Sequence, residues 1–154
     1  SVENFGSVTE LRLSRMPEMT RISNLPKLQN LEISFCPKVE LLEQVPALRR
    51  LVLNLWHSEK QLPLYLQAVK PSHFLLNCSR KVLTSMALGK SGSEWYKFSH
   101  IQHVEAYADD DGIEKSSWHL FYTRQPYNIE TNIDLQVIFV YIGKLLLLFL
   151  ISYC

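Results

Sequence analysis

The apolar residues between Leu25 and Pro37 follow a spacing that fits neither a helix nor a strand. In the segment LPKLQNLEISFCP they recur at intervals of three, three, two and three residues. An amphipathic helix needs intervals of three and four, and a half-buried strand needs strict alternation. The same spacing returns 20 residues earlier and 20 residues later, in three aligned sets: Val8, Leu11, Leu13 and Met16; Leu28, Leu31, Ile33 and Cys36; Leu48, Leu51, Leu53 and Trp56. The chain therefore contains a regular internal repeat.

This repeat has the leucine-rich pattern L-x-x-L-x-L-x-x-C, in which L-x-L is a short strand and the chain returns over the opposite side. One unit cannot bury its apolar side chains alone, so successive units stack. Phe74 and Leu76 align with Leu51 and Leu53 at a slightly longer spacing than that of the regular units, which indicates a fourth, irregular unit. We therefore expect an α/β fold, a leucine-rich-repeat solenoid of three to four repeats with a parallel sheet on its concave side.

The repeats occupy residues 1–88, of which RKVLTSMAL at 80–88 is compatible with a short helix or a last strand. Residues 89–133 form a second region, which begins with a glycine- and serine-rich loop at 89–93. Two alternating segments follow, SHIQHVEAYA at 99–108 and WHLFYTR at 118–124, with a polar Asp-Gly turn between them. This arrangement predicts a β-hairpin. We expect the hairpin to cap the end of the solenoid with its aromatic face, Trp118 and Tyr122.

Residues 134–154 form the third region, and they predict an apolar C-terminal helix. The segment LQVIFVYIGKLLLLFLISYC at 135–154 contains a single charged residue, Lys144. Its length is close to that needed to cross a bilayer core of about 30 Å at about 1.5 Å per residue. Three interpretations stay open: a transmembrane helix that anchors the protein to a membrane, a mis-joined reading frame, or a helix buried in the core.

Charge and cysteine content narrow the classes of partner and compartment. The formal net charge is +1 and 20% of the residues are charged, which argues against a nucleic-acid-binding protein. The three cysteines, Cys36, Cys78 and Cys154, are too few and too widely spaced for a disulfide framework. We therefore expect a reducing, cytoplasmic location, with membrane association only through the C-terminal tail.

No motif in the chain predicts catalysis, a metal or a cofactor. The Gly89-Lys90-Ser91 tripeptide resembles the end of a phosphate-binding loop, but Thr84 stands where that motif needs a glycine. The acidic run at 109–112 lacks the further acids of a calcium loop. The histidines at 100 and 103 have no accompanying C-x-x-C pair, and no nucleophile elbow is present. We therefore expect a protein that is not an enzyme.

The solenoid instead predicts an extended surface. The residues that alternate with the buried positions of each L-x-L strand point outward onto the concave side of the sheet. Because neighbouring strands lie about 4.8 Å apart, Arg12 can reach Glu32. Extended concave sheets of repeat proteins commonly bind partners. The candidate protein-binding residues form three columns: Glu10, Asn30 and Arg50; Arg12, Glu32 and Val52; Ser14, Ser34 and Asn54.

Three segments resemble a known family. The repeat LPKLQNLEISFCPKV is similar to the repeats of plant intracellular immune receptors of the nucleotide-binding leucine-rich-repeat class. The segments ALGKSGSEWYKFSHIQHVEAYADDDG and SSWHLFYTRQPYNIETNI resemble the region after the repeats in such disease resistance proteins from grasses. The resemblance covers residues 5–133, and the apolar tail departs from it.

The resemblance implies a non-catalytic recognition and autoinhibition module that acts in plant defense. Its partner would be a pathogen effector or the upstream nucleotide-binding domain, bound through the concave residues named above. The resemblance also implies that the chain is the C-terminal part of a longer receptor, whose coiled-coil and nucleotide-binding parts operate the switch. The alternative is a membrane-anchored leucine-rich-repeat protein that acts through its C-terminal tail.

Overall fold

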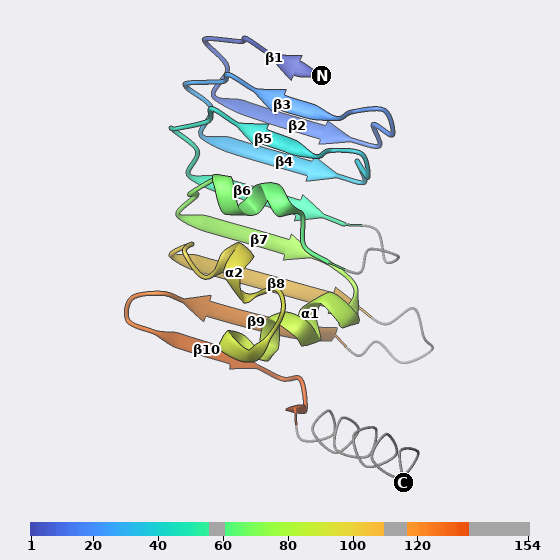
Figure 1. Ribbon diagram of the computed structural model, residues 1–154, viewed down its shortest axis with the longest axis vertical. Helices are drawn as coiled ribbons and strands as arrows, with labels where there is room; N and C mark the ends of the chain where they lie inside the picture. Colours follow the sequence, from blue (N-terminus) through green and yellow to red (C-terminus); the bar gives the residue numbers. More distant parts are fainter. Residues whose placement is uncertain (56–60, 110–116, 136–154) are drawn as a thin grey trace, which may run out of the picture.

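The chain forms a β-solenoid of about four coils, with most of its regular structure in two sheets (Figure 1). The computed structural model describes residues 1–55, 61–109 and 117–135. The small sheet is parallel and contains β1 (Val2–Glu3), β3 (Arg21–Ser23) and β5 (Leu41–Glu43). The large sheet contains, in spatial order, β10 (Asn128–Thr131), β9 (Ser117–Thr123), β8 (His103–Asp109), β7 (His73–Asn77), β6 (Arg50–Asn54), β4 (Asn30–Ser34) and β2 (Glu10–Ser14).

The register of the large sheet follows the repeat predicted from the sequence. Leu11 pairs with Leu31 and Leu31 pairs with Leu51, so each coil corresponds to one repeat unit. Leu51 then pairs with Phe74, which confirms the longer spacing of the irregular fourth unit. Because the side chains of a strand alternate between its two faces, this register brings the L-x-L leucines of every coil onto one buried face.

The same corner conformation recurs along the first three repeats. Asn4, Asn24 and Gln44 all have positive φ angles, of 66°, 53° and 56°, as do Arg15 and Phe35 at the other end of the large-sheet strands, with 53° and 54°. Such angles are uncommon outside glycine, although asparagine tolerates them best. A side-chain hydrogen bond of 2.6 Å from Asn24 to Asn4 links two of the corners. Successive coils therefore turn at equivalent residues and stay in register.

In the first half of the chain the core lies between the two sheets and is almost entirely aliphatic. Leu31, Leu51 and Leu53 of the large sheet are at most 1% exposed, and Ile22 and Leu42 of the small sheet are fully buried. A buried leucine that contacts neighbours on both sides along the solenoid contributes about 2–5 kcal/mol relative to alanine. The stacking of coils is therefore the main source of stability.

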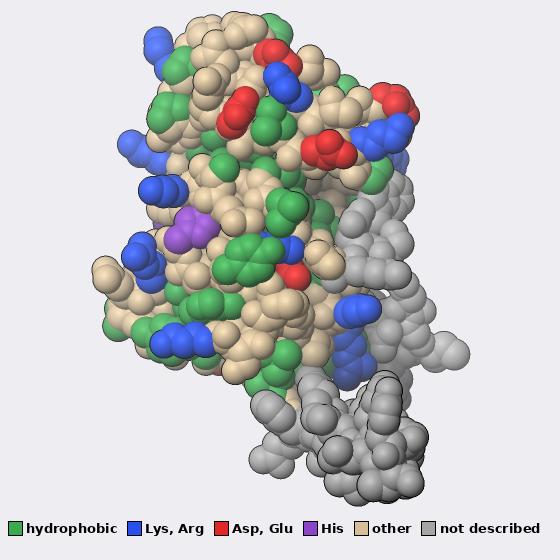
Figure 2. Space-filling model, viewed as in Figure 1, with side chains coloured by type: hydrophobic (Ala, Val, Ile, Leu, Met, Phe, Trp, Pro, Cys, Tyr) green, Lys and Arg blue, Asp and Glu red, His purple; other side chains and the backbone are tan. Residues whose placement is uncertain are grey.

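Helical segments replace the small sheet in the second half of the chain. The 3₁₀-helix η1 (Leu64–Ala68) packs beside β5, and helix α1 (Arg80–Ala87) packs against β8 and β9. The segment at 80–88 is thus a helix, which begins where the Ser79 hydroxyl accepts a hydrogen bond from the Val82 N–H at 3.4 Å. Helices η2 (Gly89–Ser91) and α2 (Trp95–Phe98) follow. Figure 2 shows this side of the molecule, with hydrophobic side chains gathered over its lower, helical half.

The prediction of a loop at residues 89–93 is wrong for residues 89–91, which form a helix. Residues Gly89–Ser91 form a 3₁₀-helix, and Gly89 is buried with a φ angle of +56°. A side chain at Gly92 would overlap the backbone oxygen of Ser85 in α1. The glycines here allow close packing of the backbone against a helix, which composition alone does not distinguish from a flexible loop.

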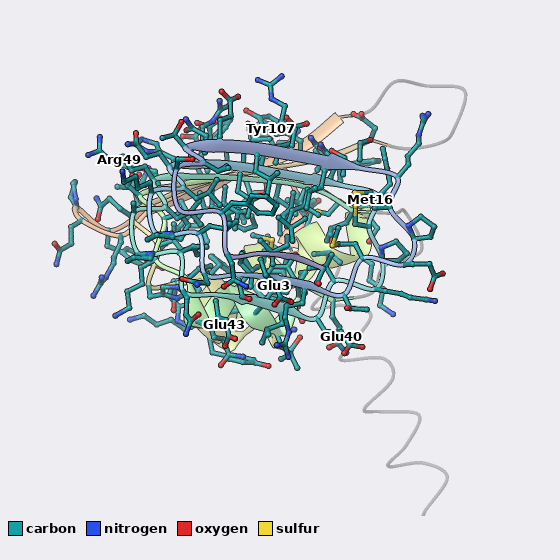
Figure 3. The ribbon with its side chains drawn as sticks, turned by 90° about the horizontal axis from the view of Figure 1, so that it is seen from above. Glu3, Met16, Glu40, Glu43, Arg49 and Tyr107 are labelled. Atoms are coloured by element: carbon teal, nitrogen blue, oxygen red, sulfur yellow. The ribbon has the colours of Figure 1, made fainter. Side chains whose placement is uncertain are left out.

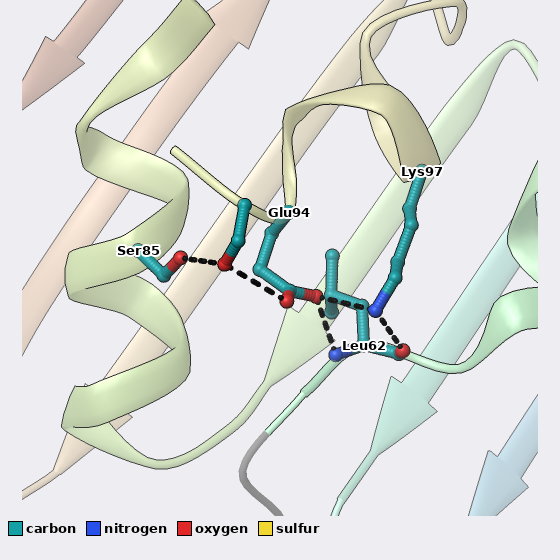
Figure 4. Close-up of polar contacts among 5 residues, drawn as sticks. Leu62, Ser85, Glu94 and Lys97 are labelled. Carbon is teal, nitrogen blue, oxygen red and sulfur yellow. Dashed lines mark hydrogen bonds and ion pairs between the residues drawn. The ribbon is translucent and has the colours of Figure 1, made fainter. Parts of the chain in front are cut away.

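A buried ion pair joins helix α2 to the segment before η1 (Figure 4). The Lys97 ammonium lies 3.0 Å from a carboxylate oxygen of Glu94, and both side chains are at most 3% exposed. The Leu62 N–H donates to the Glu94 carboxylate at 2.7 Å, and the Leu62 carbonyl accepts from Lys97 at 2.9 Å. Both charges are therefore fully partnered, as burial requires.

The predicted hairpin is present, but it extends the sheet instead of covering its end. Strand β8 pairs in parallel with β7, and β9 pairs antiparallel with β8, with Val104 opposite Tyr122. Leu120 and Tyr122 point into the core, where the Tyr122 ring meets Trp95 and Phe98 edge to face at 5.4 and 5.7 Å. The turn predicted between the strands lies within residues 110–116, outside the described residues.

The boundary predicted at residue 88 stays a prediction, and the strands on its two sides belong to one sheet. The apolar helix predicted for the C-terminal tail lies beyond residue 135, outside the described residues. Within residues 1–55, 61–109 and 117–135, no helix combines the length and the apolarity that a membrane crossing needs.

Candidate binding surface

Among the described residues, the small sheet and the helices cover one face of the large sheet, and its other face is open. The small sheet and the helical segments lie on the covered side, as Figure 3 shows when the solenoid is viewed along its length. Glu3 and Glu43 lie on that side, whereas Tyr107 projects from the opposite side of the large sheet (Figure 3). We call the outward-pointing side chains of the large sheet the open face.

The nine residues predicted as concave positions all lie on the open face, in the predicted columns. The register aligns each set of three across β2, β4 and β6. Glu10, Arg12, Ser14, Asn30 and Arg50 are exposed, and Glu32, Val52 and Asn54 are half-buried. Ser34 is the exception, at 7% exposure.

Ser34 is covered by its neighbours in the open face. Its hydroxyl accepts a hydrogen bond from the Asn54 amide at 2.7 Å and donates one to the Glu32 carboxylate at 3.4 Å. The Asn54 side chain in turn accepts a hydrogen bond from the Asn77 amide. These hydrogen bonds link β4, β6 and β7. Because the Ser34 hydroxyl is used in them, Ser34 holds neighbouring side chains in place and is not itself exposed for binding.

Charged side chains at the β2 end of the open face pair with one another. Arg12 lies 2.9 Å from the Glu10 carboxylate and 3.8 Å from that of Glu32, so the predicted contact between Arg12 and Glu32 is present. These side chains are between 38% and 74% exposed. Pairs this exposed contribute at most about 1 kcal/mol to stability. These ion pairs affect the charge of the surface more than its stability, because they place the positive charge of Arg12 beside both carboxylates.

The columns continue beyond the nine predicted residues. Strand β7 adds His73, Leu75 and Asn77, which pair with Arg50, Val52 and Asn54. The sequence could have predicted these three open-face residues, because they alternate with Phe74 and Leu76, which align with the buried positions of the repeat. Strand β8 then adds His103, Glu105 and Tyr107, and β9 adds His119, Phe121 and Thr123.

The sequence could not have predicted the open-face residues of β8 in this way. The segment between β7 and β8 is longer than that between earlier strands and contains α1, η2 and α2. The strand was also predicted to begin at Ser99, whereas β8 begins at His103. The chain between α2 and β8 continues the helical turn, with the Ile101 N–H bonded to the Phe98 carbonyl at 2.9 Å. His100 therefore lies outside the strand, where its ring contacts the Val69 carbonyl at 2.7 Å.

Aromatic rings gather on the open face of β8 and β9. Phe121 is half-buried and lies edge to face with Tyr107, at 5.9 Å between ring centroids, and 4.9 Å from the His119 ring. His73 and His103 stack at 4.9 Å further along the sheet. Partial burial, together with the charge of Glu105 and a hydrogen bond of 3.3 Å to it, raises the pKa of the Tyr107 hydroxyl above its usual value. These rings form a rigid aromatic patch that stays accessible to solvent.

The described residues contain no cluster of side chains that could hold a metal ion. No set of three or more His, Cys, Asp or Glu side chains within residues 1–55, 61–109 and 117–135 is placed to hold a metal ion. Burial raises the pKa of the Cys78 thiol to about 12, against a small opposing effect of a backbone hydrogen bond with Leu83. A thiol with so high a pKa is not a nucleophile at neutral pH.

The fold and this surface define a β-solenoid with an open, partly aromatic sheet face. Comparison with protein-family models, with curated proteins and with solved structures found no match to this chain.

Proposed function

We propose that this chain is a non-catalytic recognition module that binds a protein partner through the open face. The observation that supports this function is the uncovered side of the large sheet, which presents aligned columns of polar, charged and aromatic side chains from β2 to β9. A sheet face that is not needed for burial is free to vary in side chains without loss of the core. This is the property on which repeat proteins base their binding surfaces.

We further propose that the coils are leucine-rich repeats. The constant repeat period, the buried L-x-L positions and a short return strand on the opposite side all support this class. Cys36, at the position after the strand where the pattern has Cys or Asn, is half-buried, and its thiol lies 3.3 Å from the Ser34 carbonyl. A small residue that satisfies a backbone carbonyl at the turn fits this role.

The resemblance of residues 5–133 to grass immune receptors suggests the particular partner. In that proposal the chain contacts either a pathogen effector or the nucleotide-binding domain of its own receptor, in the plant cytosol. Autoinhibition requires reversible contact, and the mixed charges of the open face suit a reversible interface. Arg12 and Arg50 are exposed on this face, and arginine is enriched at protein interfaces.

The test measures binding of the full chain to the purified nucleotide-binding domain of a grass receptor of this class, by isothermal titration calorimetry. The double variant Arg12→Glu, Arg50→Glu reverses both arginines of the open face. The matched control, Arg21→Glu, Lys38→Glu, makes the same change of charge with side chains that are 52% and 56% exposed outside that face. We expect the open-face variant to weaken binding by more than about tenfold and the control by less than about twofold. Equal effects of the two variants would count against the open face as the interface.

A further inference from the structure

Phe121 occupies a distinctive position on the open face, because carboxylates flank it on both neighbouring strands. In the register of the large sheet, Phe121 of β9 lies opposite Glu105 of β8 on one side and opposite Glu130 of β10 on the other. Both glutamates are exposed and point to the open face, as the alternation of buried and exposed residues in β8 and β10 requires. A half-buried aromatic ring therefore lies in a row between two carboxylates.

Among the described residues, no ion pair offsets the negative charge of this row. Strands β8, β9 and β10 contain no Lys or Arg, and in the described part of the chain neither Glu105 nor Glu130 belongs to an ion pair. Arg50 is the nearest arginine of the columns and lies three strands from Phe121. At the β2 end, by contrast, both glutamates beside Arg12 are paired with its guanidinium.

An aromatic ring between unpaired carboxylates is complementary to a cation. The face of an aromatic ring attracts a cation within about 6 Å of its centroid, and a nearby carboxylate adds a charge-assisted hydrogen bond. Guanidinium is the better fit, since its plane stacks on a ring while its N–H groups extend sideways to both acids. The edge contact of Tyr107 and the ring of His119 hold Phe121 in place, so little order has to be gained on binding.

The same row continues as an apolar strip. Glu105 pairs with Leu75 of β7, and Leu75 pairs with Val52 of β6. Both apolar side chains are half-buried on the open face. Because strands lie about 4.8 Å apart, Leu75 is about 10 Å from Phe121, which an extended peptide spans in about three residues.

We infer that the open face binds a basic segment of a protein partner: an arginine of that segment stacks on Phe121 between Glu105 and Glu130, and an apolar residue about three positions away contacts Leu75 and Val52. This inference rests on the proposed function and adds to it the place and the chemistry of recognition. It assigns the row of the open face from Val52 to Glu130 to the partner's basic segment, and it leaves Arg12 and Arg50 to contacts with other parts of the same partner.

The experiment measures binding of a fluorescent synthetic peptide to the full chain by anisotropy. The peptide has a leucine three residues before a single arginine, and its control carries citrulline, which has the same shape without the charge. We expect the arginine peptide to bind at least about tenfold more tightly than the citrulline peptide, as loss of a cation–π contact and a charge-assisted hydrogen bond implies. Addition of salt should weaken the binding of the arginine peptide only.

Variants of the chain then locate the contact. Phe121→Leu keeps an apolar side chain but removes the ring, and should weaken binding of the arginine peptide by about fivefold. Glu105→Gln with Glu130→Gln should weaken it by about tenfold. Glu40→Gln, an exposed glutamate on the covered side of the molecule (Figure 3), is the matched control and should leave binding within about twofold. Thermal unfolding of each variant verifies that the fold is retained.

Equal binding of the two peptides, or an equal effect of the Phe121→Leu and Glu40→Gln variants, would overturn the inference. These outcomes differ from failure of the proposed function. If the Arg12 and Arg50 reversals still weaken domain binding while the peptides bind alike, the open face remains an interface and only the arginine site is wrong. If those reversals have no effect, the proposed function fails independently of the peptide result.

Discussion

Replacement of one repeat leucine by alanine should show how strongly the stability of this protein depends on stacking between coils. Leu11, Leu31 and Leu51 occupy the same position in three successive coils, so they differ in environment and not in type. Leu31 lies in β4, between β2 and β6, and is 1% exposed. Leu11 lies in β2, the last strand of the large sheet at that end, and is only half-buried.

The expected cost therefore differs between the two positions. For Leu31→Ala, the transfer free energy of the removed carbons adds to the free energy of the cavity left between two coils, and the total is about 2–5 kcal/mol. For Leu11→Ala, the side chain has a neighbouring coil on one side only and leaves no closed cavity, so a cost of about 1 kcal/mol follows from about 0.8 kcal/mol per buried CH₂. Domains of this size unfold with about 5–15 kcal/mol, so the first change is a large fraction of the total.

Equilibrium urea unfolding followed by circular dichroism measures both costs, provided that the dependence of the free energy on urea stays constant among the variants. Glu32→Ala is the control, because Glu32 alternates with Leu31 in the same strand but points to the open face; we expect a change within about 0.5 kcal/mol. If Leu11→Ala costs as much as Leu31→Ala, stacking of coils is not the main source of stability. If Glu32→Ala costs as much as Leu31→Ala, the assignment of the two faces of β4 is wrong.

Two further substitutions test the packing of the helical half. Lys97→Met leaves the buried Glu94 carboxylate without its cation and should cost about 3–5 kcal/mol of stability. Lys38→Met, the control, breaks an ion pair of 2.8 Å between exposed side chains and should cost at most about 1 kcal/mol. Equal shifts of the two variants in thermal unfolding would contradict the buried ion pair. Gly92→Ala places a methyl group against a backbone oxygen of α1 and should cost about 1–3 kcal/mol of stability by overpacking. Gly6→Ala, the control, should be nearly neutral, because apart from its chain neighbours no atom lies within 4 Å of the new carbon. An unchanged melting temperature of the Gly92 variant would show that the segment after α1 is not packed as described.

The first half of the fold could be predicted residue by residue because its periodicity is regular. A constant offset between units places Leu31 opposite Leu51, and side-chain alternation then fixes which residues face the core and which face outward. Even the irregular step to Phe74 was predictable, since two apolar positions define a register. The open-face residues of β2, β4 and β6 follow from the same pattern without any knowledge of the structure.

The second half could not be predicted in the same way, because helices interrupt the period. An insertion of helical turns between β7 and β8 hides the parallel pairing of Leu75 with Glu105, and nothing local in the sequence of β8 selects β7 as its neighbour. The packed conformation of Gly89 and Gly92 is likewise set by contacts with distant residues. A composition rich in glycine and serine is common to flexible loops and to tight turns, so only the tertiary contacts distinguish them.

The charge pattern of the open face separates the requirements of folding from those of binding. An exposed ion pair contributes at most about 1 kcal/mol, so the fold gains little from the cationic partner of Glu10 and Glu32. It also loses little when Glu105 and Glu130 have no cationic partner among the described residues. Stability therefore does not explain why the carboxylates at one end of the face are paired with a cation and those at the other end are not. The difference matters to a charged ligand, for which an unpaired carboxylate beside Phe121 is available and a carboxylate paired with Arg12 is not. For this reason the comparison of the Glu105 and Glu130 variants with a glutamate variant outside the open face is the experiment that separates a binding site from an ordinary solvated surface.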